Sequence, residues 1–240
     1  MKALTKKNNQ IIFTAEVEES LANAVRRYID QIPILAVDEV EISKNDSPLY
    51  DETVAHRIGM VPLKMDKTIT EESVEQLTLV AKKDGIIYSE ELKGRISPVY
   101  GKIPLTVLKK GQELEILATA RMGKGSTHSK YSPGFMFYRN LVNVKADKDC
   151  LKEVVNACPQ KILALKDGKI VATDELKCDM CELCVEFCKK TGKGKVDLVP
   201  TNELVITVES FGQIPEEDIF VKSVEVLKND LKEVAKKIAK

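Results

Sequence analysis

Six cysteines carry the most specific chemistry that this sequence could perform. All six lie within residues 150–188, and the rest of the chain has none. Cys178, Cys181 and Cys184 follow a C-x2-C-x2-C pattern, and Cys158 precedes that run by 20 residues. Three thiolates at two-residue gaps can surround one corner of an iron–sulfur cube while a fourth thiolate comes from elsewhere in the fold. The spacing therefore favours an iron–sulfur site.

Zinc and disulfides are the alternatives for these thiols. Zinc sites more often use two C-x2-C pairs separated by a longer loop, whereas here two gaps are fused into one run. Disulfides are typical of exported proteins, and residues 1–7 show no apolar core of signal-peptide length. We therefore expect metal or redox chemistry of reduced thiols, in a cytoplasmic protein.

The composition excludes several classes of protein. The chain has 240 residues, with 37 Lys and Arg against 37 Asp and Glu, so its net charge is zero. A free-standing nucleic-acid binder usually carries a basic excess, and a base-stacking platform needs aromatic side chains, of which Trp is missing here. The longest near-apolar run, residues 32–37, is far shorter than the ~20 residues of a membrane-spanning helix. We expect no direct membrane contact.

A hairpin is predicted between Cys158 and the cysteine run. Residues 162–165 and 169–172 read as two short strands, and Asp167-Gly168 is a favoured two-residue hairpin turn. Such a hairpin would bring Cys158 back toward the three later cysteines.

The order helix, Cys-Pro, hairpin, cysteine run and helix resembles a bacterial-type ferredoxin. In that family, three cysteines of one run and the last cysteine of another hold one cluster. The resemblance implies one [4Fe–4S] cluster, with [3Fe–4S] as the variant that the sequence does not distinguish. The implied ligands are Cys158, Cys178, Cys181 and Cys184.

A second cluster is not expected. Its ligands would have to stand at positions that are occupied by Lys148, Leu151 and Val154, and Cys150 is one residue out of register. Cys188 is thereby left with too few partners. Two readings of Cys150 and Cys188 stay open: free buried thiols, or a pair close enough to join on oxidation.

The first 42 residues read as a small α/β unit. Residues 11–17 alternate as a half-buried strand, and residues 20–32 show one apolar face of a helix. A strand over 34–42 follows, in which the apolar residues change phase partway. A bulge near Asp38 would reconcile the two phases.

The rest of the chain reads mostly as strands between two helices. A short helix is expected over 51–59, with Asp51 as its N-cap, then strands with turns over 65–145, and a long loop over 121–134. A strand over 204–208 precedes a terminal helix over 215–239. The apolar residues of that helix recur at spacings of 4 and 3, which is typical of a helix–helix seam.

Several stretches resemble the signature of the α-like RNA polymerase subunits, and the ferredoxin-like insert narrows the resemblance to the archaeal members. The stretches are residues 23–28, 32–42, 51–63, 123–133 and 209–228. The resemblance covers nearly the whole chain. It implies an α+β fold in which residues 1–42 and 200–240 form one discontinuous dimerisation domain. Residues 43–145 would be a strand-rich inserted domain, and 146–199 the ferredoxin-like iron–sulfur insert.

The resemblance also implies partners. The α-like subunit would heterodimerise with the smaller subunit L, helices against helices, and would recruit the second-largest subunit and the small subunits N and P. DNA and RNA would be met only indirectly, through the complex. No paired acidic motif for Mg²⁺ is present, so we expect a non-catalytic subunit of a nucleotidyltransferase, without an active site of its own.

One rival class is a ferredoxin-like electron carrier or redox-enzyme subunit. The cysteine segment alone favours it, but it gives no account of residues 1–145. The two histidines, His56 and His128, stand at no recognisable catalytic spacing, so we interpret them as solvated or hydrogen-bonded side chains.

Overall fold

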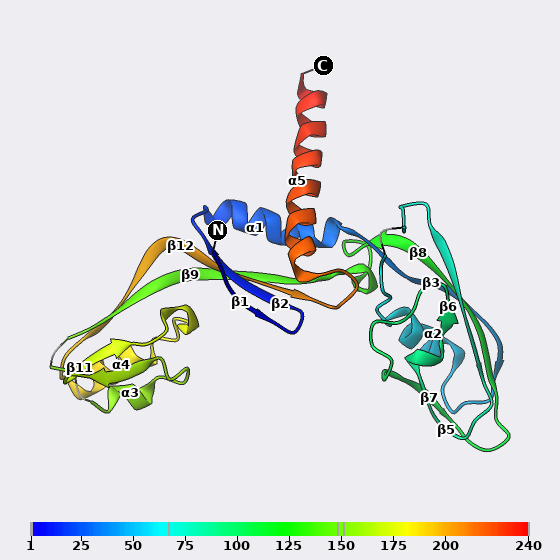
Figure 1. Ribbon diagram of the computed structural model, residues 1–240, viewed down its shortest axis with the longest axis horizontal. Helices are drawn as coiled ribbons and strands as arrows, with labels where there is room; N and C mark the ends of the chain where they lie inside the picture. Colours follow the sequence, from blue (N-terminus) through cyan, green and yellow to red (C-terminus); the bar gives the residue numbers. More distant parts are fainter. Residues whose placement is uncertain (1, 67, 148, 151, 240) are drawn as a thin grey trace. The chain divides into compact units, whose positions relative to one another are not determined.

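The computed structural model describes residues 2–66, 68–147, 149–150 and 152–239, which form a mixed α+β fold (Figure 1). The chain separates by its contacts into two units. The first comprises the start of the chain with Ile12–Ala22 and Phe137–Thr207, and the second comprises Lys7–Ile11, Asn23–Met136 and the chain from Val208 onward. The three-part division expected from the sequence stays a prediction. None of the described helices is long and apolar enough to cross a membrane.

One four-stranded sheet forms the core of the second unit, with strands in the order β3-β8-β4-β6. Helix α2 packs against β3, and a two-stranded sheet of β5 and β7 lies in the same unit. Strand β4 alternates strictly between exposed and buried residues, so Leu77, Leu79 and Ala81 enter one core while Val74 and Val80 stay exposed. The bounds are β3 (Pro33–Asn45), α2 (Asp51–Gly59), β4 (Val74–Ala81), β5 (Gly85–Tyr88), η2 (Ser89–Glu91), β6 (Lys93–Gly94), β7 (Pro104–Leu108) and β8 (Leu114–Lys124).

Strand β3 contains the predicted bulge. The register of β3 against β8 shifts between Val37 and Glu39, which leaves Asp38 without a partner residue. Val37 is fully buried, whereas the strand beyond the bulge is mostly exposed. The bulge therefore lets Val40 and Ile42 pack against the same core as Leu35 and Val37, although the apolar residues change phase between them.

Two local predictions differ from the structure. Asp51 is the first helical residue of α2 and not its cap, because the cap position is held by Tyr50 without a side-chain hydrogen bond. An acidic residue in the first turn still matches the positive end of the helix dipole. The loop expected over 121–134 is shorter, because β8 continues to Lys124 and a 3-10 turn, η3 (Ser129–Tyr131), follows. The 3-10 turn can pack Tyr131 directly over β8 because residue 123 is glycine, where a Cβ would lie 2.5 Å from the Tyr131 ring.

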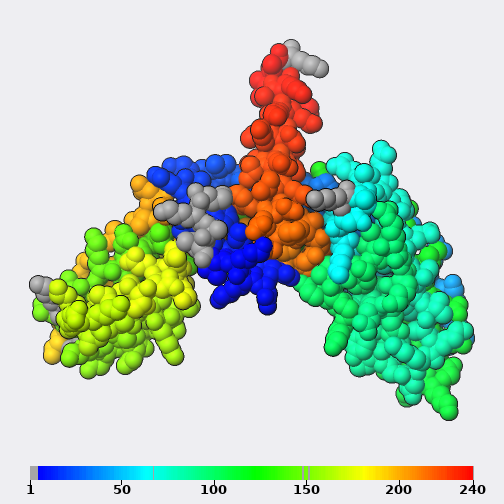
Figure 2. Space-filling view, viewed as in Figure 1, coloured from blue at the N-terminus to red at the C-terminus, as the bar shows by residue number. Residues whose placement is uncertain are grey.

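The C-terminal helix is buried in its first turns and exposed toward its end. Helix α1 (Glu19–Tyr28) continues into the 3-10 turn η1 (Ile29–Gln31), and the terminal helix α5 (Glu216–Ile238) packs against η1. Ile219 and Ser223, in the first two turns of α5, are fully buried, whereas Leu231 is 59% exposed and Ile238 80% exposed. Figure 2 shows the C-terminal half of α5 projecting beyond the atoms that surround its first half. The predicted terminal helix is confirmed.

Four strands in the order β1-β2-β12-β9 form a second sheet. Its members are β1 (Lys2–Lys7), β2 (Gln10–Ala15), β9 (Gly134–Ala146) and β12 (Val196–Ser210). The sequence predicted only residues 204–208 of β12, because Pro200 and the polar residues beside it interrupt the apolar alternation. Strands β9 and β12 lead the chain into and out of the cysteine segment.

The cysteine segment consists of short elements. They are α3 (Val154–Ala157), β10 (Leu163–Lys166), β11 (Lys169–Ala172), η4 (Glu175–Lys177) and α4 (Leu183–Thr191). This order of helix, hairpin and helix is the one that the sequence predicted. Its buried side chains, including Val142, Val154 and Val196, form a small core of their own that contains every cysteine except Cys181, which is exposed.

Candidate metal centre

The β10–β11 hairpin sets the position of Cys158 relative to the later cysteines. Leu163 pairs with Ala172 and Lys166 with Lys169, so the loop has two residues. Both loop residues, Asp167 and Gly168, have positive φ angles of 49° and 74°, as a two-residue hairpin of this type requires. The predicted hairpin is thus confirmed, beginning one residue later than expected.

The four predicted ligands line one cavity. Cys158 follows the last residue of α3, Cys178 follows η4, Cys181 lies in the loop, and Cys184 lies in the first turn of α4. All four contribute to the wall of the same cavity, whose other side chains include Val144, Ile162, Leu163 and Leu198. The structure therefore brings together the four cysteines that the ferredoxin resemblance implied. Within the described residues, no three His, Cys, Asp or Glu side chains converge as they would around one metal ion.

The backbone between the cysteines curls through two left-handed residues. Met180 and Glu182 have φ angles of 54° and 60°, although neither is glycine. A left-handed L-residue costs about 1–2 kcal/mol, so two such residues in one short loop need a compensating interaction. The backbone of Cys181, which lies between them, hydrogen-bonds to the carboxylate of Asp179. The strain is therefore located where a cluster would be bound.

N–H groups point at two of the thiol sulfurs. The backbone of Met180 hydrogen-bonds to Cys178, and the backbone of Val185 to Cys184. Burial nevertheless raises the pKa of both thiols above the usual value. These cysteines are consequently protonated at neutral pH when no metal is bound, and metal binding would release their protons.

Residues outside the cysteine pattern hold the loop in place. Nε of Arg139 donates to the carbonyl of Cys178 at 3.0 Å, and its guanidinium also donates to the carbonyl of Leu176. Nε2 of Gln160 donates to Asp179 at 3.2 Å, which ties the Cys158 loop to the cysteine run. No pattern in the sequence pointed to Arg139, since it lies on β9, far from the cysteines in the chain.

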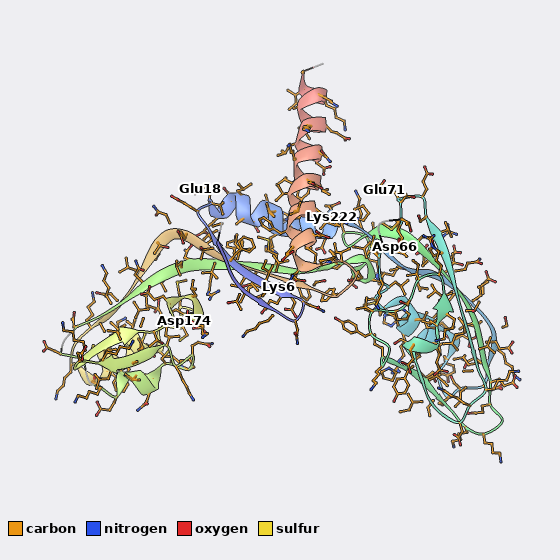
Figure 3. The ribbon with its side chains drawn as sticks, in the orientation of Figure 1. Lys6, Glu18, Asp66, Glu71, Asp174 and Lys222 are labelled. Atoms are coloured by element: carbon orange, nitrogen blue, oxygen red, sulfur yellow. The ribbon has the colours of Figure 1, made fainter. Side chains whose placement is uncertain are left out.

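The 3-10 turn before Cys178 is fixed in the same manner. Asp174, labelled in Figure 3, precedes η4 and forms an ion pair of 2.8 Å with Lys177. Glu175 accepts from the backbone N–H of Val144 at 2.8 Å. This second bond fastens the turn to β9, so Cys178 enters the cavity from a fixed direction.

Cys150 and Cys188 stand apart from this cavity and near each other. Their sulfur atoms are 3.5 Å apart, and both side chains are buried. The sequence left open whether these residues are free buried thiols or a pair close enough to join on oxidation. Both are free thiols in the structure, and their sulfurs are near each other.

The two histidines lie in the second unit. His128 Nδ1 accepts the backbone N–H of Lys130 at 3.1 Å, and His56 is exposed on α2. Both side chains contribute to one surface pocket beside Asp38, whose carboxylate is already bound by Lys130 and Tyr131. This agrees with solvated or hydrogen-bonded histidines.

Comparison with known families defines the class of this protein. Residues 40–137, which include part of β3 and all of α2, β4 and β8, match the family described as the RNA polymerase Rpb3/RpoA insert domain. With the α+β fold described above, this match indicates an RNA polymerase subunit of the α-like class.

Relatives that align with nearly the whole chain narrow the assignment to one polymerase subunit. DNA-directed RNA polymerase subunit Rpo3 of Thermococcus kodakarensis is 34% identical over 94% of this chain and 92% of its own length. Subunits of the same name from Pyrococcus horikoshii and Methanothermobacter thermautotrophicus are 33% and 30% identical, over 95% of this chain and 93% and 95% of their own. The chain belongs to the family of the archaeal DNA-directed RNA polymerase subunit Rpo3.

Proposed function

We propose that the chain is a non-catalytic assembly subunit of the polymerase, which heterodimerises with subunit L and supports recruitment of the second-largest subunit and of subunits N and P. Membership of the Rpo3 family makes it a subunit of a DNA-directed RNA polymerase. The electron-carrier alternative explained only the cysteine segment, whereas the Rpo3 relatives align with more than nine-tenths of the chain. We therefore retain the polymerase role, in the cytoplasm.

The observation that carries this proposal is the uncovered apolar face of α5. Val224, Leu227, Leu231 and Ala235 line a shallow groove of about 370 Å³ together with the stems of two lysines. Exposed apolar surface costs roughly 25 cal/mol per Å² relative to burial. The spacing of 4 and 3 along this face is that of a seam between two helices, so a helix of a partner is the occupant that fits.

Sedimentation of the full chain co-expressed with subunit L tests the proposal. We expect one heterodimer with one copy of each subunit. A chain that sediments alone in the presence of L would contradict the dimerisation role, because the groove on α5 would then have no polymerase partner to cover it.

We further propose that Cys158, Cys178, Cys181 and Cys184 hold one [4Fe–4S] cluster. Four thiols line one cavity, two left-handed residues shape the loop between three of them, and four apolar side chains with Gln160, Asp179 and Glu182 complete the wall. A bound cluster would cross-link two segments that are 20 residues apart in the sequence, as a structural metal does. Its role in this proposal is to stabilise the fold of the cysteine segment.

Metal analysis of anaerobically purified chain tests the cluster. Iron and acid-labile sulfide in a ratio near one, with about four of each per chain, would support [4Fe–4S]. Stoichiometric zinc without sulfide would refute it, and three irons per chain would point to the [3Fe–4S] variant.

A further inference from the structure

Cys150 and Cys188 face each other inside the core of the cysteine segment. Their sulfur atoms are 3.5 Å apart although 38 residues separate them in the chain. Cys150 is 8% exposed and Cys188 is 3% exposed, and neither lines the cavity of the other four cysteines. This dithiol plays no part in the function proposed above.

Cys150 contacts the segment that leads into β12. Its thiol donates to the carbonyl of Lys195 at 3.3 Å, and the N–H of Asp147 donates to the same carbonyl at 2.9 Å. Gly194 has a φ of 68°, and a Cβ there would lie 2.4 Å from the backbone nitrogen of Cys150. Only glycine permits this close approach, so the segment before β12 packs directly against the backbone of Cys150.

The backbone of Cys188 is fixed by hydrogen bonds at the end of α4. Cys188 lies in the last turns of α4, and its carbonyl accepts the N–H of Gly192 at 3.0 Å, which ends the helix. Thr191 Oγ1 donates to the same carbonyl at 3.2 Å. The proximity of the two sulfurs therefore follows from the contacts of both backbone segments.

We propose that Cys150 and Cys188 are a site of reversible oxidation, at which a peroxide converts the dithiol into a disulfide. All four cavity cysteines lie between them in the sequence. The bond closes a loop that contains the whole candidate metal centre, and a cross-link of this kind disfavours the unfolded state of the loop. Disulfide formation itself does not depend on the proposed cluster.

The chemistry requires two steps. Hydrogen peroxide oxidises the Cys150 thiol to a sulfenic acid and leaves as one water. The sulfur of Cys188 then attacks the sulfenic sulfur, the S–S bond forms, and the hydroxyl leaves as a second water, so the two sulfurs lose two electrons and two protons in total. We assign the first step to Cys150, because its side chain is the more exposed of the two, 8% against 3%. The sulfurs must approach from 3.5 Å to about 2.0 Å for the bond to form.

Peptide mapping of the anaerobically purified full-length chain tests this site. After treatment with hydrogen peroxide, the protein is quenched in acid, alkylated in denaturant and digested. We expect a peptide pair linked through Cys150 and Cys188, which dithiothreitol separates again. Cys188→Ser is the matched control and yields no intrachain link from Cys150. The proposal is overturned if both residues stay free after the cavity cysteines have oxidised, or if they link to those cysteines as often as to each other.

Hydrogen exchange tests separately whether the disulfide stabilises the loop that it closes. After removal of metal by a chelator, amides of α3 and α4 should exchange at least about tenfold more slowly in the oxidised wild-type chain than in the reduced one, since the cross-link raises the cost of opening. The same comparison on Cys188→Ser should show no difference. Equal exchange of oxidised and reduced wild type would refute the stabilisation of the loop by the disulfide. The peptide mapping is independent of the cluster, so its result would stand even if the metal analysis above found no iron.

Discussion

The hydroxyl of Tyr131 donates to Oδ1 of Asp38 at 3.0 Å, and this bond fastens the loop after β8 to the bulge of β3. The Lys130 ammonium reaches the same carboxylate oxygen at 3.1 Å. Asp30 anchors the other side of the loop, because it accepts from Ser132 at 2.9 Å. The stretch 123–133, which resembles a family signature, is therefore held in one conformation by two aspartates.

Removing the Tyr131 hydroxyl should destabilise the second unit. Tyr131 is buried, so Tyr131→Phe leaves the packing in place and deletes one hydrogen bond to a carboxylate. We expect a loss of about 1–2 kcal/mol in the free energy of unfolding, measured by urea denaturation. Tyr50→Phe is the control, because Tyr50 is 83% exposed and its change should stay within ~0.5 kcal/mol. Equal stability of the two variants would show that the bond is not stabilising.

The same bond predicts a dependence on alkaline pH. Burial, followed by the hydrogen bond to Asp38, raises the pKa of Tyr131 to about 12. The folded state thus favours the neutral phenol, so this stabilisation is complete below the unfolded pKa of about 10 and is lost as the pH rises through about 12. The stability difference between wild type and Tyr131→Phe should therefore shrink between pH 9 and pH 12. A difference that stays constant over this range would contradict the assignment.

The bulge and the cysteine cavity show what a single sequence can predict. The change of phase between Val37 and Val40 indicated a bulge at Asp38, because burial of alternate residues leaves a local pattern. Spacing and resemblance singled out the four cysteines that line one cavity, because three of them lie within residues 178–184. Arg139 could not be found in this way, because its bond to Cys178 joins residues that are 39 positions apart and belong to different elements.

Loss of one cavity cysteine should release the metal and loosen the cysteine segment. We expect Cys184→Ser to lose most of its iron, and the amides of β10, β11 and α4 to exchange faster than in wild type. Cys188→Ser removes a thiol one turn later on the same helix, outside the cavity, and should keep its iron. Wild-type exchange rates in Cys184→Ser would refute the stabilising role of the cluster.

The cysteine segment should be dispensable for pairing with subunit L. Strand β9 ends at Ala146 and β12 begins at Val196, and the N–H of Asp147 donates to the carbonyl of Lys195 at 2.9 Å. The two ends of the segment are therefore neighbours, and a short Gly/Ser linker in place of residues 148–194 can join them at little entropic cost. Co-purification with L should persist in this variant. Its loss would mean that the segment is part of the dimerisation fold.

The central claim is that α5 presents a partner interface, and a charge placed in the middle of its groove tests that claim most directly. Leu231 lines the groove, whereas Asn229 lies two residues away, about 200° around the helix, and is exposed. Leu231→Asp and Asn229→Asp each add one carboxylate to the same turn. Only the first would place it without a partner in an apolar interface.

Sedimentation of each variant co-expressed with subunit L gives the decisive comparison. We expect Leu231→Asp to weaken the heterodimer by about 100-fold or more, which corresponds to a cost of about 3 kcal/mol for burying an unpaired carboxylate. Asn229→Asp should sediment as wild-type heterodimer. Undiminished heterodimer with Leu231→Asp would contradict the interface and leave the apolar face of α5 without a role in assembly.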